Sequence, residues 1–261
     1  MFPAGPTPTA FGLIAALRRE VYPFLRQLSS VRRLSELPMA WRFQLANRPG
    51  IVAVSGMGAD KARDTAHRLI EIYAPRLIIS LGYGGAVNPD LAPGTVLLGQ
   101  EYRHFDPGGP TLNPVCSLWG GPPVPELVNH LQAAGIPAGA GVLVSTPRII
   151  AKHREAAPLL VLSNPVLDLE TAAVAAVAHH YQLPFLGLRA ITDTGLEEIP
   201  DFVIAMSQTA GKSGWRQAGR LFWTQPGRWP YLAILWRRSR RASRQLSRTL
   251  TTLLPHLGSA I

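Results

Sequence analysis

The sequence predicts an α/β protein: a three-layer α/β/α fold around a central mixed, mostly parallel sheet, extended by a basic amphipathic C-terminal helix. Three observations support this. Short apolar strands alternate with helices, as in parallel sheets that are covered on both faces. Asp193 follows the strand-like run PFLGLRAIT, and the carboxyl ends of strands are where ligands usually bind in open α/β sheets. Finally, leucines recur at helical spacing among the arginines near the C-terminus.

The first part of the chain supplies three strands and two helices. Residues 10–16 (AFGLIAA) predict a buried strand, and residues 17–28 predict a helix whose apolar side chains share one side. Residues 51–54 predict a short strand, which the glycine turn SGMGAD closes. An amphipathic helix over 61–73 and a buried strand over 77–81, followed by GYGGAVNP, continue the alternation.

The second part repeats the pattern without any internal repeat of sequence. Its predicted elements, in order, are a strand at 95–98 after a Pro-Gly turn, a helix at 125–134, a strand at 140–144, a helix at 171–181 and a strand at 184–191. Residues 107–123 are rich in Pro and Gly, and they predict a loop.

Length and composition bound the class of protein. A chain of 261 residues with 47% hydrophobic content can bury a sizeable core, and we expect one domain over 1–210 and an extension over 211–261. The single cysteine, Cys116, excludes an internal disulfide and a multi-Cys zinc site. The histidines lack metal-ligand spacing with carboxylates, so we expect no metal site. The single cysteine also fits a reducing cytoplasm. The N-terminal apolar run has no basic segment before it, which favours a strand that enters a helix over a signal peptide.

The charge is concentrated at the C-terminal end. Residues 1–201 contain equal numbers of acidic and basic residues, whereas ten basic and no acidic residues follow Asp201, so the extension carries the whole net charge of +10. No apolar run reaches the length of a membrane span. Such asymmetry indicates an anionic partner, either nucleic acid or an anionic membrane surface.

The extension also contains an amphipathic pattern over 231–254. Its apolar positions are Leu232, Leu235, Trp236, Leu246, Leu250 and Leu253. Its basic positions on the opposite side are Arg237, Arg241, Arg244 and Arg248. This pattern is typical of a helix at a membrane interface, and we expect peripheral docking on the inner membrane. Two alternatives stay open: a helix that packs its leucines on the domain and leaves a solvated basic face, and a nucleic-acid-binding helix, which we favour least.

Six segments in order resemble the nucleoside phosphorylase/nucleosidase superfamily over roughly residues 10–200. They are FGLIAALRREV, SGMGADKA, LIISLGYGGAV followed by PGTVLL, EYRHFD, VLDLETAAVA and LRAITDT. The chain is most similar to the 5′-methylthioadenosine/S-adenosylhomocysteine nucleosidases. The basic tail and a shortened core resemble the hopanoid-associated phosphorylase branch, whose members are linked to removing adenine from adenosylhopane. The resemblance also implies a homo-oligomer.

The resemblance assigns roles to three carboxylates. Asp193 stands where the family places the acid that protonates purine N7, Glu170 where a glutamate binds the ribose hydroxyls, and Glu20 where a glutamate positions the attacking water. Each also has a purely structural interpretation. Asp193 can cap a helix, Glu170 can be a first-turn glutamate that the helix dipole stabilises, and Glu20 can be an exposed helix residue.

The remaining expected substrate contacts are apolar or backbone groups. Leu169 stands where the family has a methionine on the ribose, and Ile149 or Ile150 replaces the aromatic residue that stacks on adenine. Glycines at the turn after a central strand let the backbone approach a ligand closely. Those turn positions are Gly82, Tyr83 and Gly84, with Tyr83 where the hydrolases carry a small hydroxyl residue.

The predicted function is cleavage of the N-ribosyl bond of an adenosyl compound with an apolar 5′ substituent, releasing adenine without a cofactor. Glu20 favours hydrolysis, whereas Arg18, Arg19 and the loop Gly56–Gly58 keep phosphorolysis open. A binding protein that retained the fold for membrane or nucleic-acid contact is the alternative of another class. It would have little reason to keep all three carboxylates, so the sequence favours the enzyme.

Overall fold

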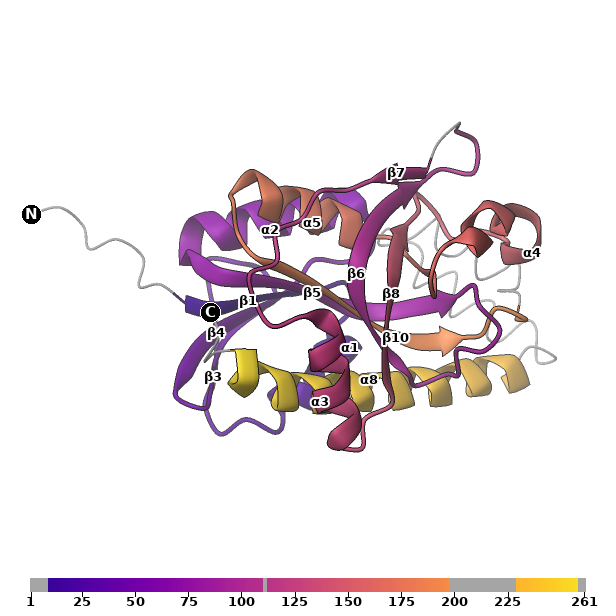
Figure 1. Ribbon diagram of the computed structural model, residues 1–261. Coiled ribbons are helices and arrows are strands. Elements are labelled where there is room, and N and C mark those ends of the chain that lie inside the picture. The colour runs from indigo at the N-terminus through magenta and orange to yellow at the C-terminus, as the bar shows by residue number, and fades with distance from the viewer. Residues whose placement is uncertain (1–8, 110–111, 198–228, 258–261) are drawn as a thin grey trace, which may run out of the picture.

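The computed structural model describes residues 9–109, 112–197 and 229–257 (Figure 1). The strands that it describes are β1 (Thr9–Ala15), β2 (Val31–Arg33), β3 (Ala40–Leu45), β4 (Arg48–Val54), β5 (Pro75–Ala86), β6 (Val96–Phe105), β7 (Leu112–Pro114), β8 (Ala138–Ser145), β9 (Val166–Asp168) and β10 (Phe185–Asp193). The helices are α1 (Arg18–Leu25), α2 (Ala59–Tyr73), α3 (Val124–Ala133), α4 (Lys152–Glu155), α5 (Thr171–His180) and α8 (Trp229–Leu257), with a 3₁₀ turn, η1, at Ala157–Val161.

These strands form one mixed sheet in the order β10-β6-β8-β9-β5-β1-β4-β3-β2, with β7 paired to β6. The central strand β5 runs parallel to β1 and β10, and β8 runs parallel to β6 and β9. Because β10 also pairs with β5, the strands β5, β10, β6, β8 and β9 close into a ring. Two pairs within the ring, β5–β9 and β6–β10, are antiparallel, so the sheet is mixed.

Two helical layers cover the sheet, as the sequence predicts. Helices α2 and α5 pack on one face, and α1, α3 and α8 pack on the other (Figure 1). The apolar side chains of α1, α3 and α8 share one buried cluster with the sheet, and those of α2 and α5 share a second. The predicted three-layer α/β/α class with a mostly parallel central sheet is therefore confirmed.

Several local predictions need correction. The first helix ends at Leu25 rather than at Leu28. The β2–β3 hairpin was not predicted, because every residue of β2 is exposed and the segment has no alternation of buried and exposed residues. The segment 107–123, predicted as loop, contains β7, which pairs with the end of β6, and a bridge from Leu118 to Pro184. Pairing with an existing strand edge supplies the hydrogen bonds that the local sequence does not predict.

The apolar side of α8 packs on the domain. Leu246, Leu250 and Leu253 are fully buried in the cluster that also contains α1, so these leucines, expected at a membrane, are covered by the protein itself. Gln27 donates a hydrogen bond to Ser247 at 3.0 Å, which adds a polar contact to the same interface. Arg244 and Arg248 are exposed. This arrangement matches the alternative of a packed helix with a solvated basic face.

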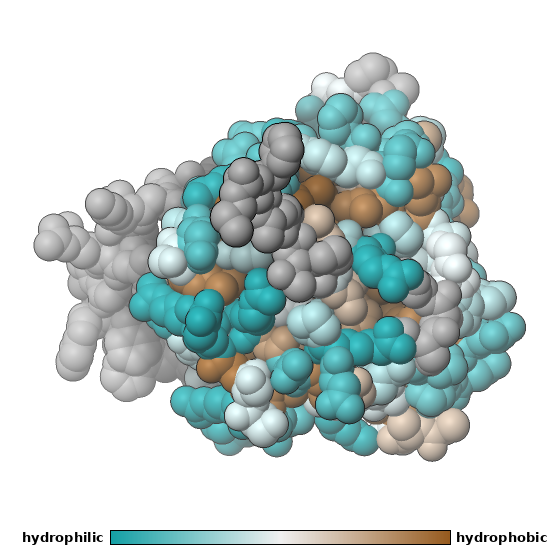
Figure 2. Space-filling view, turned by 90° about the vertical axis from the view of Figure 1, so that its left-hand side faces the viewer, coloured by the Kyte–Doolittle hydropathy of each residue, from teal (hydrophilic) through white to brown (hydrophobic). Residues whose placement is uncertain are grey.

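The first turns of α8 differ from the rest of the helix. Ile234 and Trp236 are 46% and 56% exposed, and the Arg240 guanidinium lies 4.6 Å from the centre of the Trp236 ring. The side chain of Leu232 lies outside the described part of the chain. None of the helices that the structure describes is long and apolar enough to span a membrane. At the end of the molecule opposite to these first turns, hydrophilic residues cover most of the described surface (Figure 2).

Candidate active site

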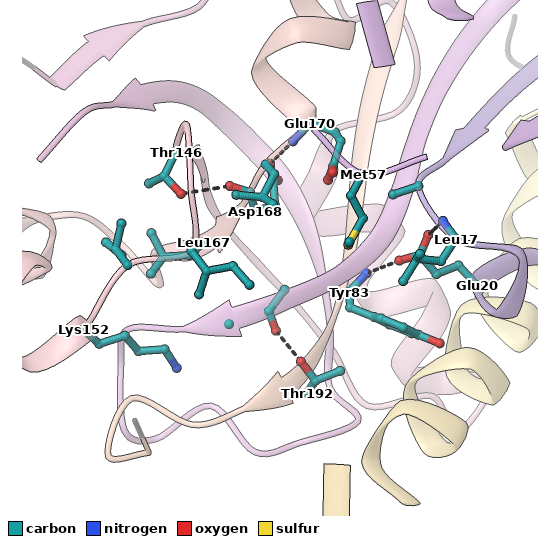
Figure 3. Close-up of a pocket in the computed structure, with 16 residues that line it drawn as sticks. Leu17, Glu20, Met57, Tyr83, Thr146, Lys152, Leu167, Asp168, Glu170 and Thr192 are labelled. Atoms are coloured by element: carbon teal, nitrogen blue, oxygen red, sulfur yellow. Dashed lines mark hydrogen bonds between the residues drawn. The ribbon is translucent and has the colours of Figure 1, made fainter. Parts of the chain in front are cut away.

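A cavity of about 180 Å³ opens at the carboxyl ends of the central strands (Figure 3). Its wall comes from the segments that follow β1, β4 and β8, from β9 and from the ends of β5 and β10. The lining residues are Ala16, Leu17, Glu20, Met57, Tyr83, Gly84, Gly85, Thr146, Ile149, Ile150, Lys152, Leu167, Asp168, Leu169, Glu170 and Thr192. Figure 3 shows Glu20 at one end, Lys152 at the other and Glu170 between them.

Glu20 lies at the cavity end that is formed by α1. Its carboxylate accepts hydrogen bonds from the backbone N–H of Leu17 at 2.7 Å and of Tyr83 at 3.2 Å, and the residue is 3% exposed. Burial first, and then the charge of Glu170, raise the pKa of Glu20 to about 7, against the opposing hydrogen bonds and the charge of Arg189. The interpretation of Glu20 as an exposed helix residue is therefore wrong. A carboxyl that titrates near neutral pH is suited to take a proton from water.

The strand β5 makes room for Glu20. A Cβ atom on Gly82 would lie 3.1 Å from Glu20 Oε1, so glycine allows the carboxylate to approach the strand. A Cβ atom on Gly84 would lie 2.4 Å from Val166 Cγ1, which shows that Gly84 is needed for packing against β9. The Tyr83 hydroxyl points away toward α8 and hydrogen-bonds with Ser243 Oγ at 2.7 Å. Burial is the main cause that raises the pKa of Tyr83.

Glu170 follows β9 at the start of α5. Its carboxylate accepts a hydrogen bond from the Gly58 N–H at 2.8 Å, and burial followed by the charge of Asp168 raises its pKa. Gly58 has a φ of 104°, a conformation that favours glycine, and it immediately precedes α2. Since the Gly58 N–H donates to Glu170, it is not free to bind an anion in the way that the phosphorolysis alternative requires.

Behind Glu170 lies a buried ion pair that the sequence analysis did not assign. Arg189 Nε donates to Asp168 Oδ2 at 3.0 Å, and Arg189 Nη2 donates to Ser80 Oγ at 3.0 Å. The N–H of Glu170 donates to Asp168 Oδ1 at 2.9 Å, so this pair anchors the turn that carries Glu170. Burial acts to raise the pKa of Asp168, but Arg189 and the hydroxyls of Ser145 and Thr171 outweigh it and lower that pKa.

Asp193 ends β10, where the sequence analysis expected it, but its neighbours differ from that expectation. Its Oδ2 forms an ion pair with Lys152 Nζ, and its Oδ1 accepts a hydrogen bond from Thr192 Oγ1 at 2.8 Å. Asp193 is therefore buried beside a cationic group. Lys152 lines the cavity, whereas Asp193 lies directly behind it. No local pattern in the sequence links Lys152 to Asp193, a strand end 41 residues away.

The other expected contacts form the apolar part of the cavity wall. Leu169, Ile149 and Ile150 all line it, together with Leu17 and Met57. Ile150 is buried, and Ile149 and Leu169 are partly exposed toward the cavity. These side chains offer apolar surface to a ring or an aliphatic group.

The described residues contain no group of three or more His, Cys, Asp or Glu that could hold a metal ion. The acidic groups of the cavity are instead paired with backbone N–H groups and with Arg189 or Lys152, as the contacts above show. This arrangement suits proton transfer and the binding of hydroxyl groups.

Known proteins are similar to this chain in sequence and in fold. The family model described as Phosphorylase superfamily matches residues 10–214. A 5′-methylthioadenosine/S-adenosylhomocysteine nucleosidase from Tolumonas auensis is 26% identical over 222 residues, covering 77% of this chain and 94% of the relative. Two crystal structures of nucleosidases of the same name share the fold with a TM-score of 0.67. The Neisseria meningitidis enzyme, in complex with methylthio-immucillin-A, is 18% identical and is aligned over 95% of this chain and 100% of that one. The Colwellia psychrerythraea enzyme, in complex with adenine, is 16% identical and is aligned over 97% of both chains.

Proposed function

Because the chain belongs to the Phosphorylase superfamily, we propose that it cleaves the N-ribosyl bond of an adenosyl nucleoside with an apolar 5′ substituent and releases adenine. Membership confirms the superfamily predicted from the sequence, and the chain is an enzyme of the N-glycosyl hydrolase or pentosyltransferase class. The observation that carries the proposal is one cavity whose largely apolar wall includes Glu20, Glu170 and Lys152, the last of which is paired with Asp193.

Each group has a place in the reaction. Glu170, between the two ends of the cavity, accepts hydrogen bonds from the ribose hydroxyls, and these bonds strengthen as positive charge develops at C1′. Glu20 orients water and takes its proton at one end. Asp193 protonates N7 of the purine at the other end. Leu169, Ile149 and Ile150 contact the ribose and the base through apolar surface.

Hydrolysis fits this cavity better than phosphorolysis. Of the charged residues that line it, Glu20, Asp168 and Glu170 are acidic and Lys152 is paired with Asp193. A phosphate dianion needs several cationic or N–H donors. Arg18 and Arg19 are exposed and do not line the cavity, and Arg18 lies over the Tyr22 ring at 4.9 Å. Water is therefore the nucleophile that the described residues support.

Adenosylhopane is our specific candidate for the substrate. The apolar lining suits an apolar 5′ group, and the first turns of α8 expose Ile234 and Trp236 beside Arg237 and Arg240, as an interfacial helix would. These first turns lie at the end of the molecule where β5 and β10 terminate (Figure 1). A lipid-tailed nucleoside could pass from a membrane at this end to the cavity without leaving the surface.

The test measures adenine release from 5′-methylthioadenosine and adenosylhopane, each with and without phosphate, by the wild type and by Asp193→Asn. We expect release that is independent of phosphate and is lost in Asp193→Asn. No release from either nucleoside would refute the proposed reaction, and strict dependence on phosphate would replace hydrolysis by phosphorolysis.

Membrane docking has its own test. Ile234→Ser with Trp236→Ser should abolish sedimentation with vesicles that contain anionic lipid, while the melting temperature stays unchanged because both side chains are exposed. Deleting all of α8 would instead remove core leucines and unfold the domain. Equal sedimentation of the double variant and the wild type would exclude these residues as the docking surface.

A further inference from the structure

The end of β5 beside the cavity is anchored through one side chain. Residues 82–85 read Gly-Tyr-Gly-Gly, so Tyr83 is the only one of the four with a side chain larger than hydrogen. Its backbone N–H donates to Glu20 Oε1 at 3.2 Å, and its ring extends toward α8, the yellow helix in Figure 3. Because glycine restricts the backbone less than any other residue, the orientation of the Tyr83 N–H depends on what its side chain contacts.

The contact between Tyr83 and α8 is a hydrogen bond with a defined direction. The Tyr83 hydroxyl and Ser243 Oγ lie 2.7 Å apart. Ser243 Oγ also donates to the Ser239 carbonyl oxygen at 2.9 Å, which uses the single hydrogen of its hydroxyl. Tyr83 is therefore the donor and Ser243 the acceptor. Since Ser243 is only 4% exposed, water does not compete well for this bond.

The surroundings of the ring keep Tyr83 in this role. The ring packs against the apolar cluster that contains residues of α1, α8 and the sheet. Burial first, and then the charge of Glu20, raise the pKa of Tyr83, against the hydrogen bond with Ser243. The hydroxyl thus keeps its proton at neutral pH and remains a donor. Ser243 lies beyond residues 10–214, which the family model matches.

Resting on the proposed function, we propose that Tyr83 is a positioning residue for the attacking water and that Ser243 of α8 anchors it. The Tyr83 N–H holds Oε1 of Glu20, and the Leu17 N–H holds Oε2. Helix α8 therefore sets the direction in which the carboxylate faces the water, in addition to covering the core. Displacing the carboxylate slows the chemical step, whereas nucleoside binding depends on Glu170 and the apolar wall and stays the same.

The experiment measures adenine release by Tyr83→Phe, Ser243→Ala and the double variant. Each single variant should lower kcat about tenfold, since misplacing a catalytic group by about 1 Å costs up to about 10². KM should change by less than about twofold. The double variant should be no slower than either single variant, because both changes remove the same bond. In a Glu20→Gln background, Tyr83→Phe should change kcat by less than about twofold, because Tyr83 acts through that carboxylate.

Ser247→Ala is the matched control, since it removes another hydrogen bond of α8, the one that Ser247 accepts from Gln27 at 3.0 Å. It should lower the melting temperature about as much as Ser243→Ala but leave kcat unchanged. Wild-type kcat in Tyr83→Phe would overturn the proposal, and so would an equal fall with and without Glu20. An equal fall in kcat for Ser247→Ala and Ser243→Ala would also overturn it. A wild type that releases no adenine would instead refute the proposed function, and this assignment with it.

Discussion

Replacing Glu20 by glutamine tests the water-activating end of the cavity. The side chain is 3% exposed, and burial first, then the charge of Glu170, raise its pKa from 4.5 to about 7. Glutamine keeps the shape but removes the titration. It also turns an NH₂ group toward the N–H of either Leu17 or Tyr83, which costs about 1–3 kcal/mol at every pH. The informative quantity is therefore the pH dependence of stability and not its value at a single pH.

The sign of that dependence follows from proton linkage. Between pH 4.5 and about 7 the folded state holds the Glu20 proton and the unfolded state has lost it, so the stability of the wild type falls as pH rises through this window. The loss is about 3 kcal/mol, at about 1.4 kcal/mol for each pKa unit. Relative to the wild type, Glu20→Gln should gain about that amount between pH 4.5 and pH 8.

Activity should follow the same titration. If ionised Glu20 takes the proton of water, kcat/KM of the wild type should fall about tenfold per pH unit below pH 7. Glu20→Gln should lower kcat/KM by about 10² to 10⁴ on the plateau above pH 7 and should lose this dependence on pH.

Urea unfolding at pH 4.5, 6 and 8 and steady-state adenine release over the same range provide the measurements. Glu126→Gln, at an exposed position of α3, is the matched control, and its stability should run parallel to that of the wild type. Parallel curves for Glu20→Gln and the wild type would refute the argument that Glu20 is buried with a raised pKa. Full activity of Glu20→Gln would refute its role at the water.

Three further changes test other parts of the structure. Leu250→Ala creates a cavity under α8 at a fully buried position, so thermal unfolding should show that the free energy of unfolding falls by about 2–5 kcal/mol. A fall of less than about 1 kcal/mol would mean that α8 does not pack on the domain. Gly82→Ala places a Cβ atom 3.1 Å from Glu20 Oε1, so kcat/KM should fall by about 10² through displacement of the carboxylate while the melting temperature changes little, and unchanged kinetics would contradict this geometry. Arg189→Met leaves the buried charge of Asp168 unpaired, so the free energy of unfolding in urea should fall by about 3–5 kcal/mol. A second change, Asp168→Asn, should restore much of this free energy, and no recovery in the double variant would argue against the ion pair.

Much of the fold could be predicted from local pattern. Apolar strands and one-sided helices are set by side chains that are near neighbours in sequence, and the structure contains the predicted elements from β1 to β10 in order. The hairpin of β2 and β3 escaped prediction because β2 is wholly exposed and its pairing partner supplies its hydrogen bonds. The positions of Glu20 and Glu170 on the cavity wall could also be predicted, because they are part of segments that resemble a known superfamily.

The spacing of leucines and arginines predicts that α8 has an apolar face and a basic face, but what covers the apolar face depends on the fold. Helical period fixes which side chains share a face, whereas the covering surface comes from α1 and the sheet, far away along the chain. The same reason applies to the cavity. Sequence identified Asp193 as a carboxylate at a strand end, but the ring of strands placed Lys152 against it and Arg189 against Asp168. Such ion pairs depend on strand order and close backbone approach, which no local pattern of residues contains.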